Sequence, residues 1–147
     1  MQAITGEFVL SFGSKGTGLG QFDTLRGLSL TPDESCLLVC DTHNHRVVVA
    51  DARDGRSLRS LQGPAGTLVQ PMQAVVVPQT GQVLVVDCKR CHVVVFAGVD
   101  DDTVVRTLGD GDGQGPRQLN SPCGLAVSDG EVADAARPQG EFNCRGP

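Results

Sequence analysis

The sequence contains neither tryptophan nor tyrosine, and aromatic residues make up only 3% of its 147 positions. Single-stranded nucleic acids are commonly held by aromatic side chains that stack on the bases, so this scarcity argues against a broad RNA-binding surface. Basic residues are also outnumbered, with 12 lysines and arginines against 17 aspartates and glutamates and a net charge of -5. Because phosphate binding needs a basic patch, nucleic acid is disfavoured as the main partner but stays an alternative.

Long hydrophobic segments are absent too. No run approaches the roughly 18 apolar residues of a membrane-spanning helix. The amino-terminal stretch MQAITGEFVLSFG lacks the basic start and apolar core of a secretory signal. We therefore expect a cytoplasmic protein that makes no membrane contact and keeps its six cysteines reduced.

The residues that are abundant build strands and turns. Valine and leucine dominate the apolar positions, and 19 glycines and 8 prolines punctuate them. β-Branched residues favour strands, whereas glycine and proline mark turns. No segment repeats apolar residues at helical spacing for long enough to form a helix. The composition therefore predicts many short strands.

A polar turn between two apolar runs occurs twice. Residues 41–49 read DTHNHRVVV after the run LLVC, and the same frame returns as LVVDCKRCHVVVF. Asp41 and Asp87 are 46 residues apart, as are Arg46 and His92. Asp and Asn side chains can bond local backbone groups in place of strand partners, so each copy predicts an antiparallel hairpin.

Each copy contains four short strands, and repeats of roughly 40 to 50 residues with four antiparallel strands are typical of β-propeller blades. We predict an all-β fold of incomplete propeller form, with two full blades plus flanking strands. The expected divisions are an outer strand of a preceding blade with a glycine-rich loop (1–25), a first blade (26–63), a second blade (64–109), the start of a third blade (110–132) and a disordered or aberrant tail (133–147).

The flanking strands are expected at Phe8–Phe12 and Cys123–Val127. A single blade cannot bury both faces of its sheet and needs a neighbour on each side. We therefore expect the chain to be a fragment of a longer propeller, completed by further repeats or by self-association.

The first hairpin carries a specific resemblance. Asp41 follows a small-residue strand, and Asn44, His45 and Arg46 follow a polar pair. These residues match, one by one, the signature of the NHL repeat, and the chain resembles that family over residues 7–132. The resemblance implies a propeller that is usually six-bladed. In this family such propellers often form the target-recognition end of tripartite-motif ubiquitin ligases.

The later copies depart from the signature. The second keeps Asp87 but has Arg90, Cys91 and His92 where the first has Asn-His-Arg. The third keeps only the stretch SPCGLAVSDGEV. No RING or B-box zinc module is visible, so ligase activity is implied only for a longer relative.

The hairpin residues form a structural turn motif rather than a catalytic site. An Asp at the end of one strand can pair with an Arg at the start of the next and satisfy backbone amides of the turn. A catalytic group is needed once, whereas a turn device is needed in every repeat. We assign this structural role to five residues: Asp41, Asn44, His45, Arg46 and Asp87.

The glycine-rich stretch GTGLG invites comparison with phosphate-binding loops. It does not fit them, because Gln21 stands where GxGxxG needs its third glycine and no GK[ST] motif follows. No helix or βαβ unit follows either. We interpret it as a loop between strands.

No metal or other cofactor is expected. Cys36 and Cys40 would lie about 13 Å apart along one strand, too far for one tetrahedral zinc ion. Cys88 and Cys91 flank a tight turn, where oxidation to a disulfide is the alternative to two free thiols. The acidic run at 100–102 lacks calcium-loop spacing and is interpreted as solvated loop acids.

Nothing in the sequence supports an enzyme. The motifs GxSxG and HExxH are absent. No His, Asp or Glu recurs at the start of the expected innermost strands, where propeller enzymes place such groups. The best candidate for contact with a partner is a basic spot made by Lys89 and Arg90, with Lys15 or Arg117 nearby.

We interpret the chain as a non-enzymatic platform for protein–protein interaction, with loops on a stiff scaffold that bind a protein partner. Substrate recognition for a ubiquitin ligase is one form of this role. RNA binding through the loop-bearing face is the alternative, and a lyase-like metalloenzyme propeller is a second alternative.

Overall fold

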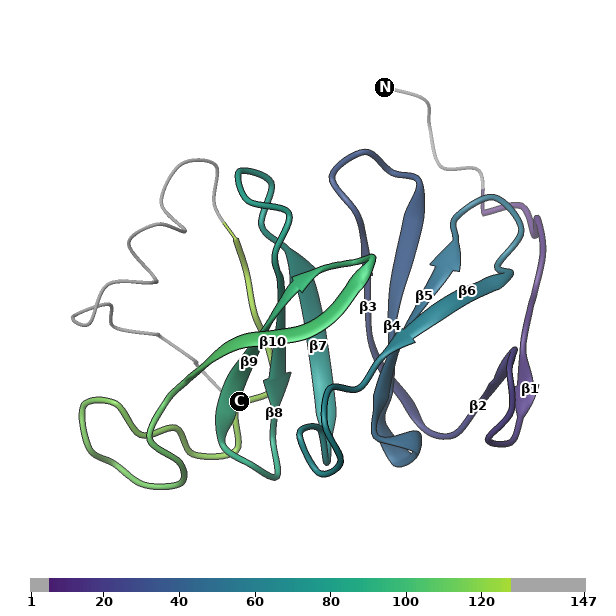
Figure 1. The fold of residues 1–147 in the computed structure, drawn as a ribbon. Coiled ribbons are helices and arrows are strands. Elements are labelled where there is room, and N and C mark those ends of the chain that lie inside the picture. The colour runs from purple at the N-terminus through teal and green to yellow at the C-terminus, as the bar shows by residue number, and fades with distance from the viewer. Residues whose placement is uncertain (1–5, 128–147) are drawn as a thin grey trace.

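The structure is a computed structural model that describes residues 6–127. The tail expected at 133–147 lies outside the described residues. Two four-stranded antiparallel sheets form the molecule, and they stand side by side in Figure 1.

The first sheet, called blade one, has its strands in sequence order. They are β3 (Leu25–Leu30), β4 (Cys36–Asp41), β5 (Arg46–Asp51) and β6 (Ser57–Leu61). A 3-10 turn, η1 (Thr42–Asn44), joins β4 to β5, and the hairpin closes with Asp41 opposite Arg46.

The second sheet, called blade two, repeats this arrangement. Its strands are β7 (Pro71–Val76), β8 (Val83–Asp87), β9 (His92–Gly98) and β10 (Asp101–Leu108), again paired in sequence order. Asp87 lies opposite His92, as Asp41 lies opposite Arg46. The predicted all-β fold of four-stranded propeller blades is confirmed, with two full blades and no closed ring within residues 6–127.

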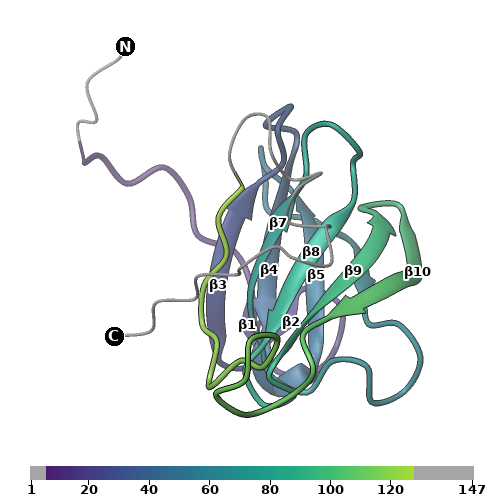
Figure 2. The same cartoon turned by 90° about the vertical axis from the view of Figure 1, so that its left-hand side faces the viewer.

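The two blades pack face to face over one apolar core. In Figure 2 the molecule is seen from the side of blade two, and the two sheets overlap. We call the face of a blade that points toward the next blade its leading face and the opposite one its trailing face. The leading face of blade one contributes Leu38, Cys40, Val47 and Val49, and the trailing face of blade two contributes Ala74, Val83, Val85, Val94 and Phe96.

The repeat generates the same two faces on the outside of the pair. Adding 46 to the positions of the leading face of blade one gives Leu84, Val86, Val93 and Val95, which form a second apolar cluster. Subtracting 46 from Ala74, Val83, Val85 and Val94 gives the trailing face of blade one: Leu28, Leu37, Val39 and Val48. Consecutive strand residues alternate between two apolar faces, which explains the continuous valine runs.

The expected flanking strands do not form. Residues 6–13 contain no strand, and two short parallel strands follow instead, β1 (Ser14–Lys15) and β2 (Gln21–Phe22). Cys123–Val127 forms no strand either, although Leu125 packs against blade two. Both predictions were wrong because an apolar segment becomes a strand only when a partner strand lies beside it, and residues 6–127 supply none there.

The one helical element in residues 6–127 is the three-residue η1. No helix in this part of the chain is long and apolar enough to cross a membrane.

The core between the blades should carry most of the stability. Phe96 is fully buried in it, whereas Phe8 is 78% exposed. We expect Phe96→Ala to lower the free energy of unfolding by about 3–5 kcal/mol, because the truncation leaves a cavity. The matched control Phe8→Ala should change it by less than about 0.5 kcal/mol. Urea denaturation followed by circular dichroism measures both, and equal losses would contradict the packing described.

Candidate functional site

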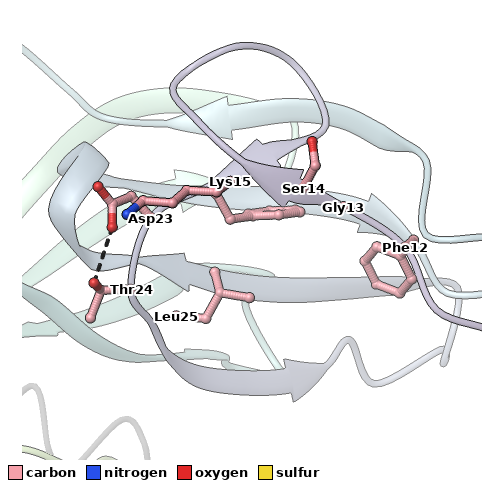
Figure 3. Close-up of a pocket in the computed structure, with 8 residues that line it drawn as sticks. Phe12, Gly13, Ser14, Lys15, Asp23, Thr24 and Leu25 are labelled. Atoms are coloured by element: carbon pink, nitrogen blue, oxygen red, sulfur yellow. Dashed lines mark hydrogen bonds between the residues drawn. The ribbon is translucent and has the colours of Figure 1, made fainter.

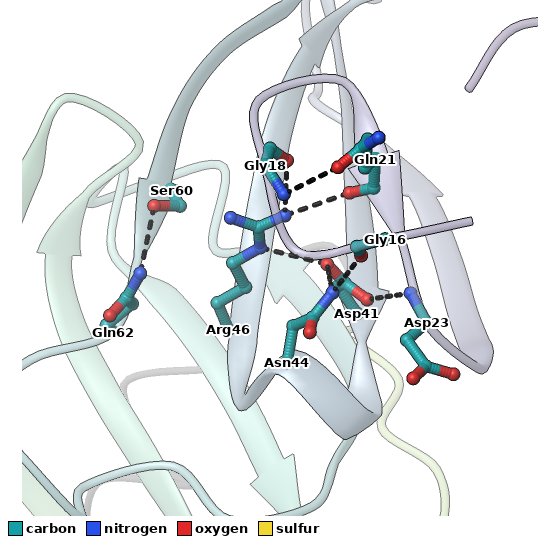
Figure 4. A network of polar contacts seen from close by, with 9 residues as sticks. All are labelled: Gly16, Gly18, Gln21, Asp23, Asp41, Asn44, Arg46, Ser60 and Gln62. Carbon is teal, nitrogen blue, oxygen red and sulfur yellow. Dashed lines mark hydrogen bonds and ion pairs between the residues drawn. The ribbon is translucent and has the colours of Figure 1, made fainter. Parts of the chain in front are cut away.

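A buried carboxylate organises the turn between β4 and β5 (Figure 4). Asp41 is fully buried at the end of β4. Its Oδ1 accepts a hydrogen bond from the backbone N–H of Asp23 at 2.7 Å. Its Oδ2 accepts from Asn44 Nδ2 and from Arg46 Nε, each at 2.9 Å. A buried charge is tolerated only with such compensation, so the carboxylate holds the two side chains in place.

The same two side chains reach the glycine-rich stretch ahead of blade one, which we call the amino-terminal lead loop (residues 16–22). Asn44 Nδ2 donates to the carbonyl of Gly16 at 2.8 Å. Arg46 Nη2 donates to the carbonyls of Gly18 at 3.1 Å and Gln21 at 2.9 Å. Asn44 and Arg46 therefore connect the turn to the loop, through Asn44 Nδ2 and through Arg46 Nε and Nη2.

A glutamine closes this loop from inside. Gln21 Oε1 accepts from the N–H of Gly18 at 3.0 Å, and Gln21 N–H donates to the carbonyl of Gly18 at 3.1 Å. Gly16 has φ +152°, and a Cβ at that position would meet the Gln21 side chain. The glycine-rich stretch therefore binds its own glutamine, and the N–H of Gly18 is not available to a phosphate.

Sequence reasoning missed that this loop occurs twice. Residues 113–119, the carboxy-terminal lead loop, repeat the spacing with Gln118 in place of Gln21. The N–H of Gly115 donates to Gln118 Oε1 at 3.0 Å, and Gln118 N–H donates to the carbonyl of Gly115 at 3.0 Å. Gly113 has φ +153°. The pattern Gly-x-Gly-x-x-Gln followed by Phe or Leu was the signal that could have revealed it.

The turn of blade two keeps the carboxylate and changes its partners. Asp87 is fully buried and accepts from the N–H groups of Val69 at 2.6 Å, Gln70 at 3.0 Å and Arg90 at 2.9 Å. Arg90 Nη2 donates to the carbonyl of Gly66 at 2.8 Å. A guanidinium again reaches the loop ahead of its blade, but from a different position in the turn.

His45 connects the two blades. It sits at the end of η1 with φ +57°, and Cys91 takes the equivalent left-handed position in blade two with φ +53°. His45 Nδ1 lies 2.6 Å from the carbonyl oxygen of Val69. Because a carbonyl can only accept, Nδ1 carries the proton. Nearby, Thr42 Oγ1 donates to the carbonyl of Pro71 at 2.7 Å, so the turn of blade one is bonded to blade two.

His92 takes the position that Arg46 has in blade one. Burial is the main cause that lowers the pKa of its imidazole below the usual value. Its Nε2 is buried without a hydrogen-bond partner among residues 6–127. The ring is therefore neutral at pH 7 and does not act as a second arginine.

The predicted basic spot is divided by the fold. Lys15 lies on β1, and in Figure 1 β1 stands at the opposite side of the molecule from the loop after β10, which carries Arg117. Lys89 and Arg90 are exposed in the turn between β8 and β9. Leu119 packs in one cluster with Cys91, so the loop of Arg117 lies beside that turn. The structure groups Lys89, Arg90 and Arg117 and leaves Lys15 apart.

The described part of the chain has two grooves on its surface. One, of about 460 Å³, opens between the amino-terminal segment and the start of β3 (Figure 3). Its lining mixes apolar and charged residues: Phe12, Gly13, Ser14, Lys15, Phe22, Asp23, Thr24 and Leu25. The other, of about 540 Å³, is lined by Gly63, Pro64 and residues 101–104.

The acidic run at 100–102 is tied to the backbone. Asp102 Oδ1 accepts from the N–H groups of Gln62 at 2.7 Å and Gly63 at 2.9 Å. Hydrogen bonds from Thr103 hold the pKa of Asp101 below its usual value. Within the part of the chain that the structure describes, no group of three or more His, Cys, Asp or Glu side chains is arranged to hold a metal ion.

The thiols differ in their surroundings. Cys40 is buried in the core, and burial raises its pKa to about 12. Burial also raises the pKa of Cys88, with smaller contributions from Cys123, Cys91 and Asp87. Cys123 is exposed.

No protein-family model and no curated protein matches the sequence. Among solved structures, the chain is similar to hydrazine synthase of Kuenenia stuttgartiensis, with 21% identity over 76% of this chain and a TM-score of 0.52. It spans only 28% of that chain. A second match, Hsv2 of Kluyveromyces lactis, has 15% identity over 52% of this chain and 23% of that chain, with a TM-score of 0.43. The first likeness shows a β-propeller-like fold and nothing about activity.

Removing the guanidinium of Arg46 should release the amino-terminal lead loop. We expect Arg46→Ala to cost about 2–3 kcal/mol of stability, because the buried Asp41 carboxylate loses its charged partner. Backbone amides of residues 16–22 should exchange with deuterium faster, as measured by mass spectrometry. Arg53, which pairs with Asp51 at 2.9 Å on the surface, provides the control, and Arg53→Ala should cost less than about 1 kcal/mol. Unchanged exchange in residues 16–22 would contradict the assignment.

The thiols should react in the order of their exposure. At pH 8 roughly one Cys40 thiol in ten thousand is ionised when its pKa is about 12. We expect iodoacetamide to modify the exposed Cys123 first and Cys40 last, with the sites identified by peptide mass spectrometry. In denaturant this difference should disappear. Equal rates at the two sites in the native protein would be inconsistent with the burial of Cys40.

Proposed function

We propose that this chain is part of an NHL-type β-propeller that serves as a protein-binding platform and not as an enzyme. One observation carries the proposal: Asp41, Asn44 and Arg46, which match the family signature, bond to one another and to the lead loop. These bonds stiffen the turn, which supports a structural role for the three residues. A stiff scaffold with exposed loops is the usual basis of an interaction platform.

The contact surface in this proposal is the end of the molecule that carries the turn between β8 and β9 and the carboxy-terminal lead loop (Figure 1). Lys89, Arg90 and Arg117 are exposed there. Arg117 shares its charge with Asp110 at 3.4 Å, and the Arg90 guanidinium holds Gly66, so Lys89 is the cation with most freedom. We assign an acidic protein segment as the partner. Target recognition for a ubiquitin ligase would be one use of this surface in a longer protein.

RNA is the second candidate, because the same basic residues would contact phosphates. The surface offers few aromatic platforms for bases, since the sequence has only five phenylalanines and no other aromatic residue. No observation within residues 6–127 favours the lyase-like metalloenzyme over these two.

Charge reversal at one end of the molecule tests the platform. We expect Lys89→Glu to remove the proteins that chemical cross-linking attaches to the full chain in cell extract, with identification by mass spectrometry. Arg56→Glu, in the turn between β5 and β6 at the other end, is the matched control and should leave those cross-links in place (Figure 1). Equal cross-linking by the wild type and both variants would rule out this surface.

The same variants separate protein from RNA. Binding to a single-stranded RNA, followed by fluorescence anisotropy, should be weak and little affected by Lys89→Glu. If binding instead falls steeply with added salt and disappears in Lys89→Glu, RNA replaces protein as the partner.

A further inference from the structure

A blade junction in this molecule is sealed by one apolar side chain from the connecting segment. Leu68 has this role between blade one and blade two and belongs to their shared core. Phe22 comes ahead of blade one and packs on Val39 and Val48 of its trailing face. Leu119 comes after blade two and packs on its leading face. Residues 6–127 therefore contain one complete junction and two half junctions, each with its own seal.

The two half junctions are complementary because the repeat makes them so. The leading face of blade two is equivalent to the leading face of blade one, and the trailing face of blade one is equivalent to that of blade two. The complete junction shows that these two kinds of face fit together. A second copy of the chain therefore offers each outer face an equivalent of the surface that the matching inner face packs against inside the chain.

If two copies join in this way, the new junction has two candidate sealing residues, and it has room for one. Phe22 and Leu119 would both fall between the joined faces, where the complete junction holds Leu68 alone. The loops that carry them have the same conformation, with the same glutamine bonds and the same glycine torsion angle. One loop can therefore replace the other.

The two loops differ in what holds them. Asn44 and Arg46 donate to the carbonyls of the amino-terminal lead loop, and Gln21 is half-buried. Within residues 6–127 no side chain donates to the carbonyls of the carboxy-terminal lead loop, and Gln118 is exposed. The carboxy-terminal lead loop has the shape that an Asp-x-x-Asn-x-Arg turn grips, and residues 6–127 contain no such turn for it.

The region around the amino-terminal lead loop is loosely covered. Phe8 and Val9, just ahead of it, are 78% and 84% exposed, and Leu19 within it is 81% exposed. On the trailing face beside it, Leu28 is 62% exposed, and Leu30 next to it on β3 is 51% exposed. An incoming loop and sheet would cover apolar surface that the chain's own segment leaves open.

We propose that the chain binds a second copy of itself head to tail by loop exchange. The carboxy-terminal lead loop of one copy displaces the amino-terminal lead loop of the next and takes its place on Asn44 and Arg46. Leu119 then seals the patch of Val39 and Val48. The segment of Leu125, which covers the leading face of blade two within one copy, leaves that face so that the two outer faces meet. Such a contact is heterologous, so it produces a ring or a chain of copies rather than a symmetric dimer.

Two glutamines in matched loops test this directly. The mass of the full chain in solution, measured by light scattering over a range of concentrations, should rise above that of the monomer. Gln118→Ala should weaken the association by roughly tenfold or more, because it unfastens the donor loop. Gln21→Ala should leave it unchanged or strengthen it, because it unfastens the competing loop. A wild-type chain that stays monomeric at all concentrations, or equal effects of both substitutions, would overturn the proposal.

Complementation tests the direction of the contact. The Gln118→Ala variant still has the turn with Asn44 and Arg46 that accepts a loop. The Arg46→Ala variant still has an intact carboxy-terminal lead loop to supply. We expect neither variant to associate alone and an equal mixture to form a dimer that grows no further. If Arg46→Ala has lost its β-sheet circular dichroism, Asn44→Ala takes its place in the mixture. A mixture of folded variants that stays monomeric would overturn the proposal.

The two contacts share the carboxy-terminal lead loop with Arg117, but Lys89, in the turn between β8 and β9, belongs only to the proposed partner-binding surface. Lys89→Glu should leave self-association unchanged, so the loop exchange and the proposed function can fail separately. Reduced self-association of Lys89→Glu in the same light-scattering measurement would count against exchange through the lead loop.

Discussion

The structure depends on a carboxylate that is buried at the end of the second strand of each blade. Such a charge must be compensated, and the chain compensates Asp41 with the side chains of its own turn and a backbone amide from the segment ahead of the blade. The compensation joins parts of the chain that are about twenty residues apart. Because the same turn also bonds to Val69 and Pro71, it determines how one blade is placed against the next.

Comparison of the two blades shows which features of the buried-carboxylate turn occur in both. Blade two keeps the buried carboxylate and a guanidinium that reaches the preceding loop, but the guanidinium comes from Arg90. The position of Arg46 is taken by His92, which is neutral because it is buried. Within residues 62–70, the loop ahead of blade two, no glutamine side chain bonds a glycine of its own loop as Gln21 does ahead of blade one. The fold therefore tolerates different side chains around the carboxylate, which is why a signature that has degenerated still marks a blade.

The proposed function depends on two features of the molecule: a rigid scaffold of strands and turns, and side chains that are exposed on its loops. The polar residues Asp41, Asn44 and Arg46 bond to one another and to the backbone of the scaffold. The exposed residues of the proposed contacts lie in turns and lead loops. The two proposed contacts are an exposed basic end around Lys89 and the two outer sheet faces with their sealing residues Phe22 and Leu119. They adjoin at the carboxy-terminal lead loop, which carries both Arg117 and Leu119. In both proposals the repeat is the source of the contact: its turns supply the binding end, and its equivalent sheet faces supply the joining surfaces.

The repeat period and the hairpins were determined by the sequence itself, because alternation and turn residues act over a few positions and recur 46 residues later. The strands expected at Phe8–Phe12 and Cys123–Val127 did not follow, since a strand needs a partner that local pattern does not supply. The reach of Arg46 to backbone carbonyls was decided only in three dimensions, because it joins residues from separate segments. The bond between Gln21 and Gly18 is local and was missed only because its pattern was not recognised. Packing between the blades decides which sheet faces meet and which side chain lies between them. A local sequence pattern does not carry this information.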